Sequence, residues 1–163
     1  MILGMTLTAY TILHVILSVI GIATGLVVVG GLLAGSRLPL TTAIFLITTL
    51  ATTLGGFLFP FNGFTPAIGV GIVSTLVLLI TIAARYIYRL QDSWRWIYVG
   101  GAVIALYLNS FVLVAQSFLK VPSLNIYAPT GSEPPFAITQ GVVLAVFVVL
   151  GIMSIWRFRP VLS

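Results

Sequence analysis

The chain has 163 residues, of which 60% are apolar and only 6% are charged, whereas a soluble domain carries about a quarter of its residues as Asp, Glu, Lys or Arg. Because this small number of charges cannot cover a water-facing surface, the composition excludes a soluble globular domain. It predicts an integral membrane protein. The net charge of +5 does not indicate nucleic-acid binding, because the cations are spread over short segments and form no basic face.

A transmembrane helix needs about 20 apolar residues, with a range of about 17–25. Five stretches of the sequence meet this requirement: 8–34, 39–60, 66–88, 94–119 and 135–157. Pro39, Pro66 and Pro135 stand at the predicted helix starts, where a missing N–H costs little. The sequence therefore predicts an all-α fold, with one transmembrane domain (1–163) of five spans and a long loop at 120–134.

The distribution of cations predicts the orientation of these spans. With the N-terminus outside, only Lys120 of the 7 Lys and Arg residues falls on the outer side. The others fall on the cytoplasmic side, as the positive-inside rule requires: Arg37, Arg85, Arg89, Arg95, Arg157 and Arg159. We therefore expect the N-terminus outside and the C-terminus in the cytoplasm.

Small and hydroxyl-bearing residues recur on one face of each of the first two spans. In the first span they follow His14 and Ser18 along one helical stripe, at Gly21 and Gly25. In the second span they are Thr48, Thr52, Gly55 and the adjacent Gly56. Membrane helices pack through such small residues, so these are predicted helix-packing faces. The sequence leaves open whether they pack within one chain or between protomers.

Polar side chains gather in the outer half of the predicted bundle. They are His14, Asn62, Asn109, Gln116 and Gln140, with Tyr127 and Glu133 in the outer loop. Because such groups are costly in hydrocarbon, they should face the bundle interior or a cavity. One interpretation makes them interhelical hydrogen bonds worth about 0.6 kcal/mol each on average. The other makes them the lining of an outward-facing pocket, with Asn62 and Glu133 at its rim.

The loop at 120–134 bears on this second interpretation. Unstructured connections of this length are uncommon and often serve as lids or binding loops. As a lid, it would fold over the outer mouth of the bundle and bring Tyr127 and Glu133 near His14. The alternative is a plain solvent loop.

Groups that could carry catalysis or bind a metal are scarce. The two carboxylates, Asp92 and Glu133, are predicted on opposite sides of the membrane, so no carboxylate pair forms within one chain. The single His cannot supply a pair of haem ligands, and the absence of Cys excludes thiolate metal sites. We assign no catalytic residue and no metal site, and leave the cofactor open.

Two segments predicted on the outer side, FLFPFNGFTPA at 57–67 and APTGSEPPF at 128–136, resemble a family of small polytopic bacterial inner-membrane proteins. The stretch from Trp94 to Val114 is also similar. The resemblance implies a multi-pass protein of the bacterial inner (cytoplasmic) membrane and implies no activity. In that family the position of Asn62 is often His, so this chain departs from it there.

Two functions from different classes fit these patterns. The small-residue faces favour a non-enzymatic membrane protein, in contact with lipid, that acts by association as a homo-oligomer or as an accessory subunit of an inner-membrane complex. The alternative is a binding or transport protein for a small lipophilic ligand, quinone-like or haem-like, held in an outward-facing pocket. An enzyme is a third and less favoured function.

Overall fold

The computed structural model describes residues 1–61 and 63–159, and within them regular structure is helical apart from an isolated bridge between Ile2 and Met5. The helices are α1 (Leu7–Leu33), α2 (Pro39–Gly56), α3 (Pro66–Ile82), α4 (Trp94–Lys120), α5 (Pro122–Asn125) and α6 (Pro134–Arg157). Helices α1, α2, α4 and α6, and the continuous helical stretch Pro66–Ile87 that begins with α3, are long and apolar enough to cross a membrane. The predicted all-α bundle with five spans is confirmed.

Local sequence signals explain where the helices begin and end. Thr6 and Thr65 cap α1 and α3, each accepting a hydrogen bond from a backbone N–H in the first turn. Pro39 and Pro66 open α2 and α3. Gly35 adopts the left-handed conformation (φ 73°) just after α1, and the N–H of Ser36 closes the helix by donating to the carbonyl of Gly31.

The second span, the third span and the outer loop differ from the prediction, while the other predicted helix ends agree with the structure to within one residue. The second span ends at Gly56 and not at residue 60, and residues 57–59 form turns whose N–H groups bond back to the end of α2. The third span finishes in a π-helical turn, η1 (Ala83–Ile87). The loop at 120–134 is not unstructured, because Pro122 starts α5 directly after α4, and α6 begins at Pro134.

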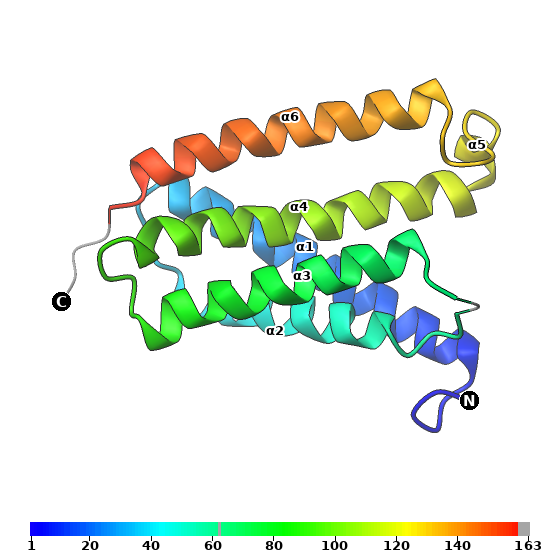
Figure 1. Cartoon of the computed structure of the whole chain (residues 1–163), viewed down its shortest axis with the longest axis horizontal. Helices are drawn as coiled ribbons and strands as arrows, with labels where there is room; N and C mark the ends of the chain where they lie inside the picture. The colour runs from blue at the N-terminus through cyan, green and yellow to red at the C-terminus, as the bar shows by residue number, and fades with distance from the viewer. Residues whose placement is uncertain (62, 160–163) are drawn as a thin grey trace.

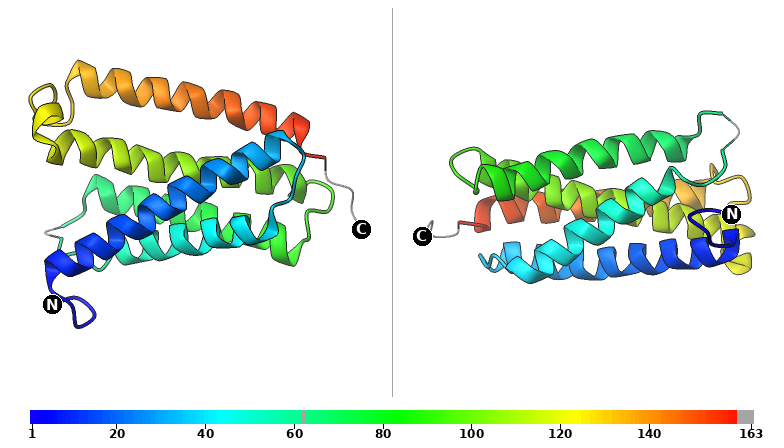
Figure 2. Two further views of the ribbon diagram at one scale, coloured as in Figure 1. Left: turned by 180° about the vertical axis from the view of Figure 1, so that it is seen from behind. Right: turned by 90° about the horizontal axis from the view of Figure 1, so that it is seen from below.

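The central helix of the bundle is α4, which packs against α1, α2, α3 and α6. The peripheral helix α6 lies along α4 and meets α1 only near the C-terminal end of the chain (Figures 1 and 2). Helix α1 begins and helix α6 ends at opposite ends of the bundle (Figure 1). Which end faces the cytoplasm stays a prediction.

The small residues of the predicted packing faces lie where helices approach closely within the chain. A Cβ on Gly25 would lie 2.6 Å from Leu106 Cδ1 of α4 and 2.8 Å from Phe45 Cε2 of α2. A Cβ on Gly21 would lie 2.9 Å from the hydroxyl oxygen of Thr49. These glycines therefore let α1 approach α2 and α4 closely.

The end of α2 lies against α1 in a similar way. A Cβ on Gly55 would lie 2.8 Å from the Tyr10 hydroxyl oxygen, and one on Gly56 would lie 3.8 Å from His14 Cε1. The Tyr10 hydroxyl also donates a hydrogen bond to the carbonyl of Gly55 at 2.8 Å. The first part of α1 is thus fixed to the end of α2.

Candidate functional site

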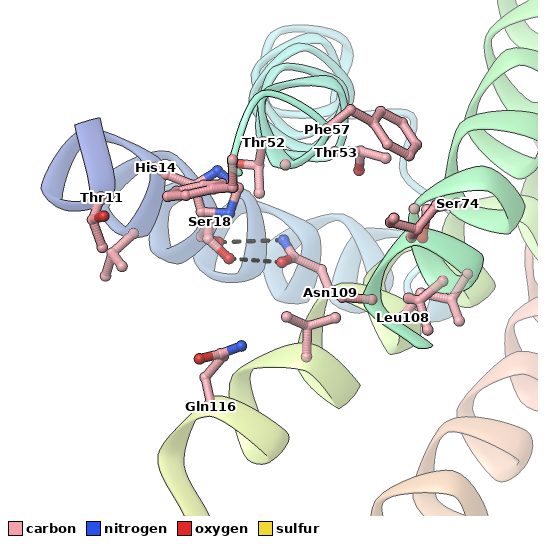
Figure 3. Close-up of a pocket in the computed structure, with 18 of the residues that line it drawn as sticks. Thr11, His14, Ser18, Thr52, Thr53, Phe57, Ser74, Leu108, Asn109 and Gln116 are labelled. Carbon is pink, nitrogen blue, oxygen red and sulfur yellow. Dashed lines mark hydrogen bonds between the residues drawn. The ribbon is translucent and has the colours of Figure 1, made fainter. Parts of the chain in front are cut away.

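A cavity of about 500 Å³ lies inside the bundle at the end that holds the N-terminus. Its walls come from the first half of α1, the second half of α2, the first half of α3 and the second half of α4. Most of the lining is apolar, but polar side chains contribute from all four helices (Figure 3). They are Thr11, His14, Ser18, Thr49, Thr52, Thr53, Ser74, Asn109, Gln116 and Lys120.

A pair of hydrogen bonds between α1 and α4 closes the deep side of this cavity. The Ser18 hydroxyl donates to Asn109 Oδ1 at 2.7 Å, and Asn109 Nδ2 donates to the Ser18 carbonyl at 3.3 Å (Figure 3). Asn109 is buried, and a Cβ on Gly21, in the next turn of α1, would lie 3.2 Å from Asn109 Nδ2. The two helices are therefore held together at this depth.

Two threonine hydroxyls of α2 line the cavity without a hydrogen-bond partner. Thr49 and Thr52 are only 2% and 8% exposed, and neither hydroxyl oxygen has a partner among the residues that the structure describes. Thr48 on the same helix behaves differently, because its hydroxyl donates to the carbonyl of Ile44 at 2.7 Å. Bonding back to the preceding turn is the usual way for a helical Thr to satisfy its hydroxyl. Thr49 and Thr52 lack this intrahelical bond, and their hydroxyl oxygens are enclosed by neighbouring atoms at the cavity wall.

Aromatic rings line the cavity at the end of the bundle. The ring of Phe59, in the connection after α2, lies edge-on to His14 with centroids 5.2 Å apart and is 5.1 Å from the ring of Tyr10. Phe57 packs against α3, since a Cβ on Gly71 would lie 2.9 Å from its Cζ. The half-buried His14 thus contributes its imidazole to the cavity wall beside these aromatic rings.

The structure brings together only some of the predicted pocket residues. His14, Asn109 and Gln116 line the cavity. Gln140 is buried between α4 and α6, where its Nε2 donates to the carbonyl of Phe111 at 3.0 Å, so it does not reach the cavity. Asn62 lies outside the described residues.

Tyr127 and Glu133 also lie apart from the cavity, so the loop between α4 and α6 does not fold over His14 as a lid would. Its hydrogen bonds are local: Asn125 Nδ2 donates to the carbonyl of Phe118 at the end of α4. Tyr127 is exposed, while Ala128 is fully buried and holds the loop against the bundle. Lys120, the last residue of α4, is the part of the segment 120–134 that reaches the cavity rim.

Glu133 forms its hydrogen bonds within its own loop. Its carboxylate accepts hydrogen bonds from the Thr130 hydroxyl at 2.8 Å and from the backbone N–H groups of Thr130 and Ser132 at 3.1 and 3.0 Å. Desolvation raises the pKa of this carboxyl, but the hydrogen bonds outweigh it and lower the pKa from 4.5 to about 2. Glu133 therefore holds the turn before α6.

The chemistry available in the cavity is binding by neutral hydrogen-bonding groups. Its lining contains no carboxylate, and Lys120 at the rim is its one cation among the described residues. Within residues 1–61 and 63–159 no group of three His, Cys, Asp or Glu side chains is placed to hold a metal ion. Sequence patterns missed the unpartnered hydroxyls of Thr49 and Thr52; the several Thr residues of α2 were the available signal.

No family model, curated protein or solved structure matches the chain, so its function is inferred from the geometry of this cavity.

Proposed function

We propose that this protein binds a small, neutral, lipophilic ligand that carries hydrogen-bond acceptors, in the cavity between α1, α2, α3 and α4. The observation that carries the proposal is the pair of enclosed hydroxyls of Thr49 and Thr52, two residues of the cavity wall, which lack partners among the described residues. A buried polar group without a partner costs about 1–3 kcal/mol. A ligand with carbonyl oxygens would remove this cost by accepting both hydrogen bonds, once rotation of the two side chains about χ1 turns their hydroxyls to the cavity.

The size and lining of the cavity support the same class of ligand. Small-molecule sites commonly have volumes of about 300–1,000 Å³, mostly apolar walls and a few placed polar groups; this cavity of about 500 Å³ has all three features. A quinone-like molecule, with carbonyls on an apolar ring, matches neutral donors better than a haem does. Haem would need an axial ligand from His14 alone, since the chain contains 1 His.

Association with other subunits, which the sequence favoured, now has less support. Its main argument was the abundance of small-residue faces, and Gly21, Gly25 and Gly55 all pack against neighbouring helices of the same chain. The proposed location is the bacterial inner membrane, supported by the family resemblance at 57–67 and 128–136. The positive-inside pattern supports a cavity in the outer half of that membrane.

Titration of the purified protein with a quinone tests this proposal. The protein in lipid nanodiscs is titrated with a decyl-substituted benzoquinone, and the Thr49→Val/Thr52→Val double variant is compared with wild type. Loss of two hydrogen bonds at about 1 kcal/mol each should weaken binding by roughly 30-fold.

Thr48→Val is the matched control, because it removes a hydroxyl that is bonded within its own helix. This control should keep the wild-type affinity. Equal affinity in the double variant and in wild type, or no binding of any quinone to wild type, would contradict the proposed function.

A further inference from the structure

Two further polar side chains of the cavity lining have no hydrogen-bond partner among the described residues. Ser74 of α3 is only 6% exposed, and its hydroxyl is unpartnered, whereas the hydroxyl of the adjacent Thr75 donates to a carbonyl of the preceding turn at 2.8 Å. Both ring nitrogens of His14 on α1 are also unpartnered. Unlike the hydroxyl oxygens of Thr49 and Thr52, the Ser74 hydroxyl oxygen and the imidazole nitrogens are not enclosed.

His14 and Ser74 lie on opposite walls of the cavity. Helices α1 and α3 each pack against α2 and α4, but within the part of the chain that the structure describes they do not pack against each other. They therefore face each other across the space that the cavity occupies. Figure 3 shows His14 on α1 at one side of this space and Ser74 on α3 at the other.

The two side chains also lie at about the same depth in the bundle. The imidazole of His14 lies beside the last turn of α2, since a Cβ on Gly55 would lie 3.7 Å from its Nδ1. On α3, a Cβ on Gly71 would lie 2.9 Å from the ring of Phe57, which directly follows α2. Ser74 is about 4.5 Å further into the bundle, at the depth of the same last turn. His14 and Ser74 are therefore separated across the cavity and not along it.

On this basis, and resting on the proposed function, we infer that the ligand bridges α1 and α3 through two oxygens at opposite ends of one ring, as in a 1,4-quinone. One carbonyl accepts a hydrogen bond from the His14 imidazole, and the other accepts one from the Ser74 hydroxyl. Each carbonyl oxygen accepts up to two hydrogen bonds, so these contacts add to those of Thr49 and Thr52. A lipid with a polar group at one end only would leave either His14 or Ser74 without a partner.

Substitutions at both ends of this bridge, combined with ligands that carry two oxygens or one, test the inference. His14→Phe keeps an aromatic ring beside Phe59 and removes both nitrogens, and Ser74→Ala removes the hydroxyl. Thr75→Val is the matched control on α3, because its hydroxyl is already bonded within that helix. His14→Gln restores an N–H donor at the first position.

Each protein, in phosphatidylcholine nanodiscs, is titrated with decyl-benzoquinone and with a decyl-substituted cyclohexenone, whose ring carries a single carbonyl. We expect His14→Phe and Ser74→Ala each to weaken binding of the quinone about fivefold, and their combination to weaken it about 25-fold. Only one of the two substitutions should weaken binding of the cyclohexenone, because that ligand has one acceptor. Thr75→Val and His14→Gln should bind the quinone within about twofold of wild type.

Wild-type affinity for the quinone in either His14→Phe or Ser74→Ala would overturn the bridge, while quinone binding by wild type would leave the proposed function standing. Equal weakening of both ligands by both substitutions would mean that the two side chains share one oxygen, and would also overturn the bridge. A loss in Thr75→Val equal to that in Ser74→Ala would assign the effect to the packing of α3 and overturn it as well. If the quinone does not bind wild type, the proposed function fails, and this inference fails with it.

Discussion

Alanine in place of Gly101 should disrupt the contact between α3 and α4. A Cβ at this position would lie 2.1 Å from the hydroxyl oxygen of Thr81 and 3.2 Å from its Cβ. Thr81 is fully buried, and its hydroxyl donates to the carbonyl of Val77 at 2.7 Å. Because a β-branched side chain has few alternative rotamers in a helix, either that bond breaks or the helices separate.

The expected loss of stability in Gly101→Ala follows from these contacts. Overpacking a well-filled interior costs typically about 1–3 kcal/mol, and an interhelical or intrahelical side-chain bond in a membrane protein adds about 0.6 kcal/mol. We therefore expect Gly101→Ala to lower the free energy of unfolding by about 2–3 kcal/mol. Reversible unfolding in mixed detergent micelles with increasing dodecyl sulfate, followed by circular dichroism, measures it.

The adjacent Gly100 provides a matched control, because no atom lies within 4 Å of a Cβ built there. Gly100→Ala should be neutral or stabilising by up to about 1 kcal/mol through helix propensity. Thr81→Ala removes the clashing oxygen, so the Thr81→Ala/Gly101→Ala pair should lose less stability than the sum of the single changes, by about 1 kcal/mol or more. Equal stability of Gly101→Ala and Gly100→Ala would refute this reasoning.

Three further predictions concern the helix contact, the outer turn and the topology. Ser18→Ala should lower the free energy of unfolding by about 0.6–1.7 kcal/mol, the range for interhelical hydrogen bonds in membranes, in the same detergent titration; an unchanged value would contradict the contact with Asn109. Because the pKa of Glu133 is lowered from 4.5 to about 2, the stabilisation of its turn is complete above pH 4.5 and is lost as the pH falls toward 2. The Thr130 amide resonance should follow this titration and lose it in Glu133→Gln; a midpoint near 4.5 would contradict the hydrogen bonds. Alkaline phosphatase fused to the C-terminus should be inactive, since the cation distribution predicts a cytoplasmic C-terminus; an active fusion would reverse the orientation.

The fold was predictable because its signals are local. Apolar runs of sufficient length, with Pro39 and Pro66 at the first helical positions, define spans whatever their neighbours are. The structured loop was not predictable in this way, since α5 has only four residues and depends on contacts such as Asn125 with the end of α4. The π-helical turn after α3 likewise has no sequence signature of its own.

The sequence predicted how deep in the membrane each candidate site residue lies, but not which neighbouring helix its side chain faces. Position along a span gave the correct end of the bundle for His14, Asn109 and Gln116. It also grouped Gln140 with them, although α6 lies on the other side of α4 and directs this side chain toward Phe111. Thr48 and Thr49 differ in whether the hydroxyl bonds back to its own helix, and the amino-acid sequence does not show this difference.

The hydroxyls of Thr49 and Thr52 are expected to serve the binding of a ligand and not the stability of the fold. Thermal unfolding of wild type and of Thr49→Val/Thr52→Val, each with and without decyl-benzoquinone, measures both properties in one experiment. Without quinone the double variant should unfold at a higher temperature, because each buried hydroxyl without a partner costs about 1–3 kcal/mol and each kcal/mol shifts the midpoint by about 2–4 °C. With quinone the wild type should gain more than the variant, as expected for a ligand that binds only the folded state. A variant with a lower midpoint than wild type and an equal gain on adding quinone would contradict the account.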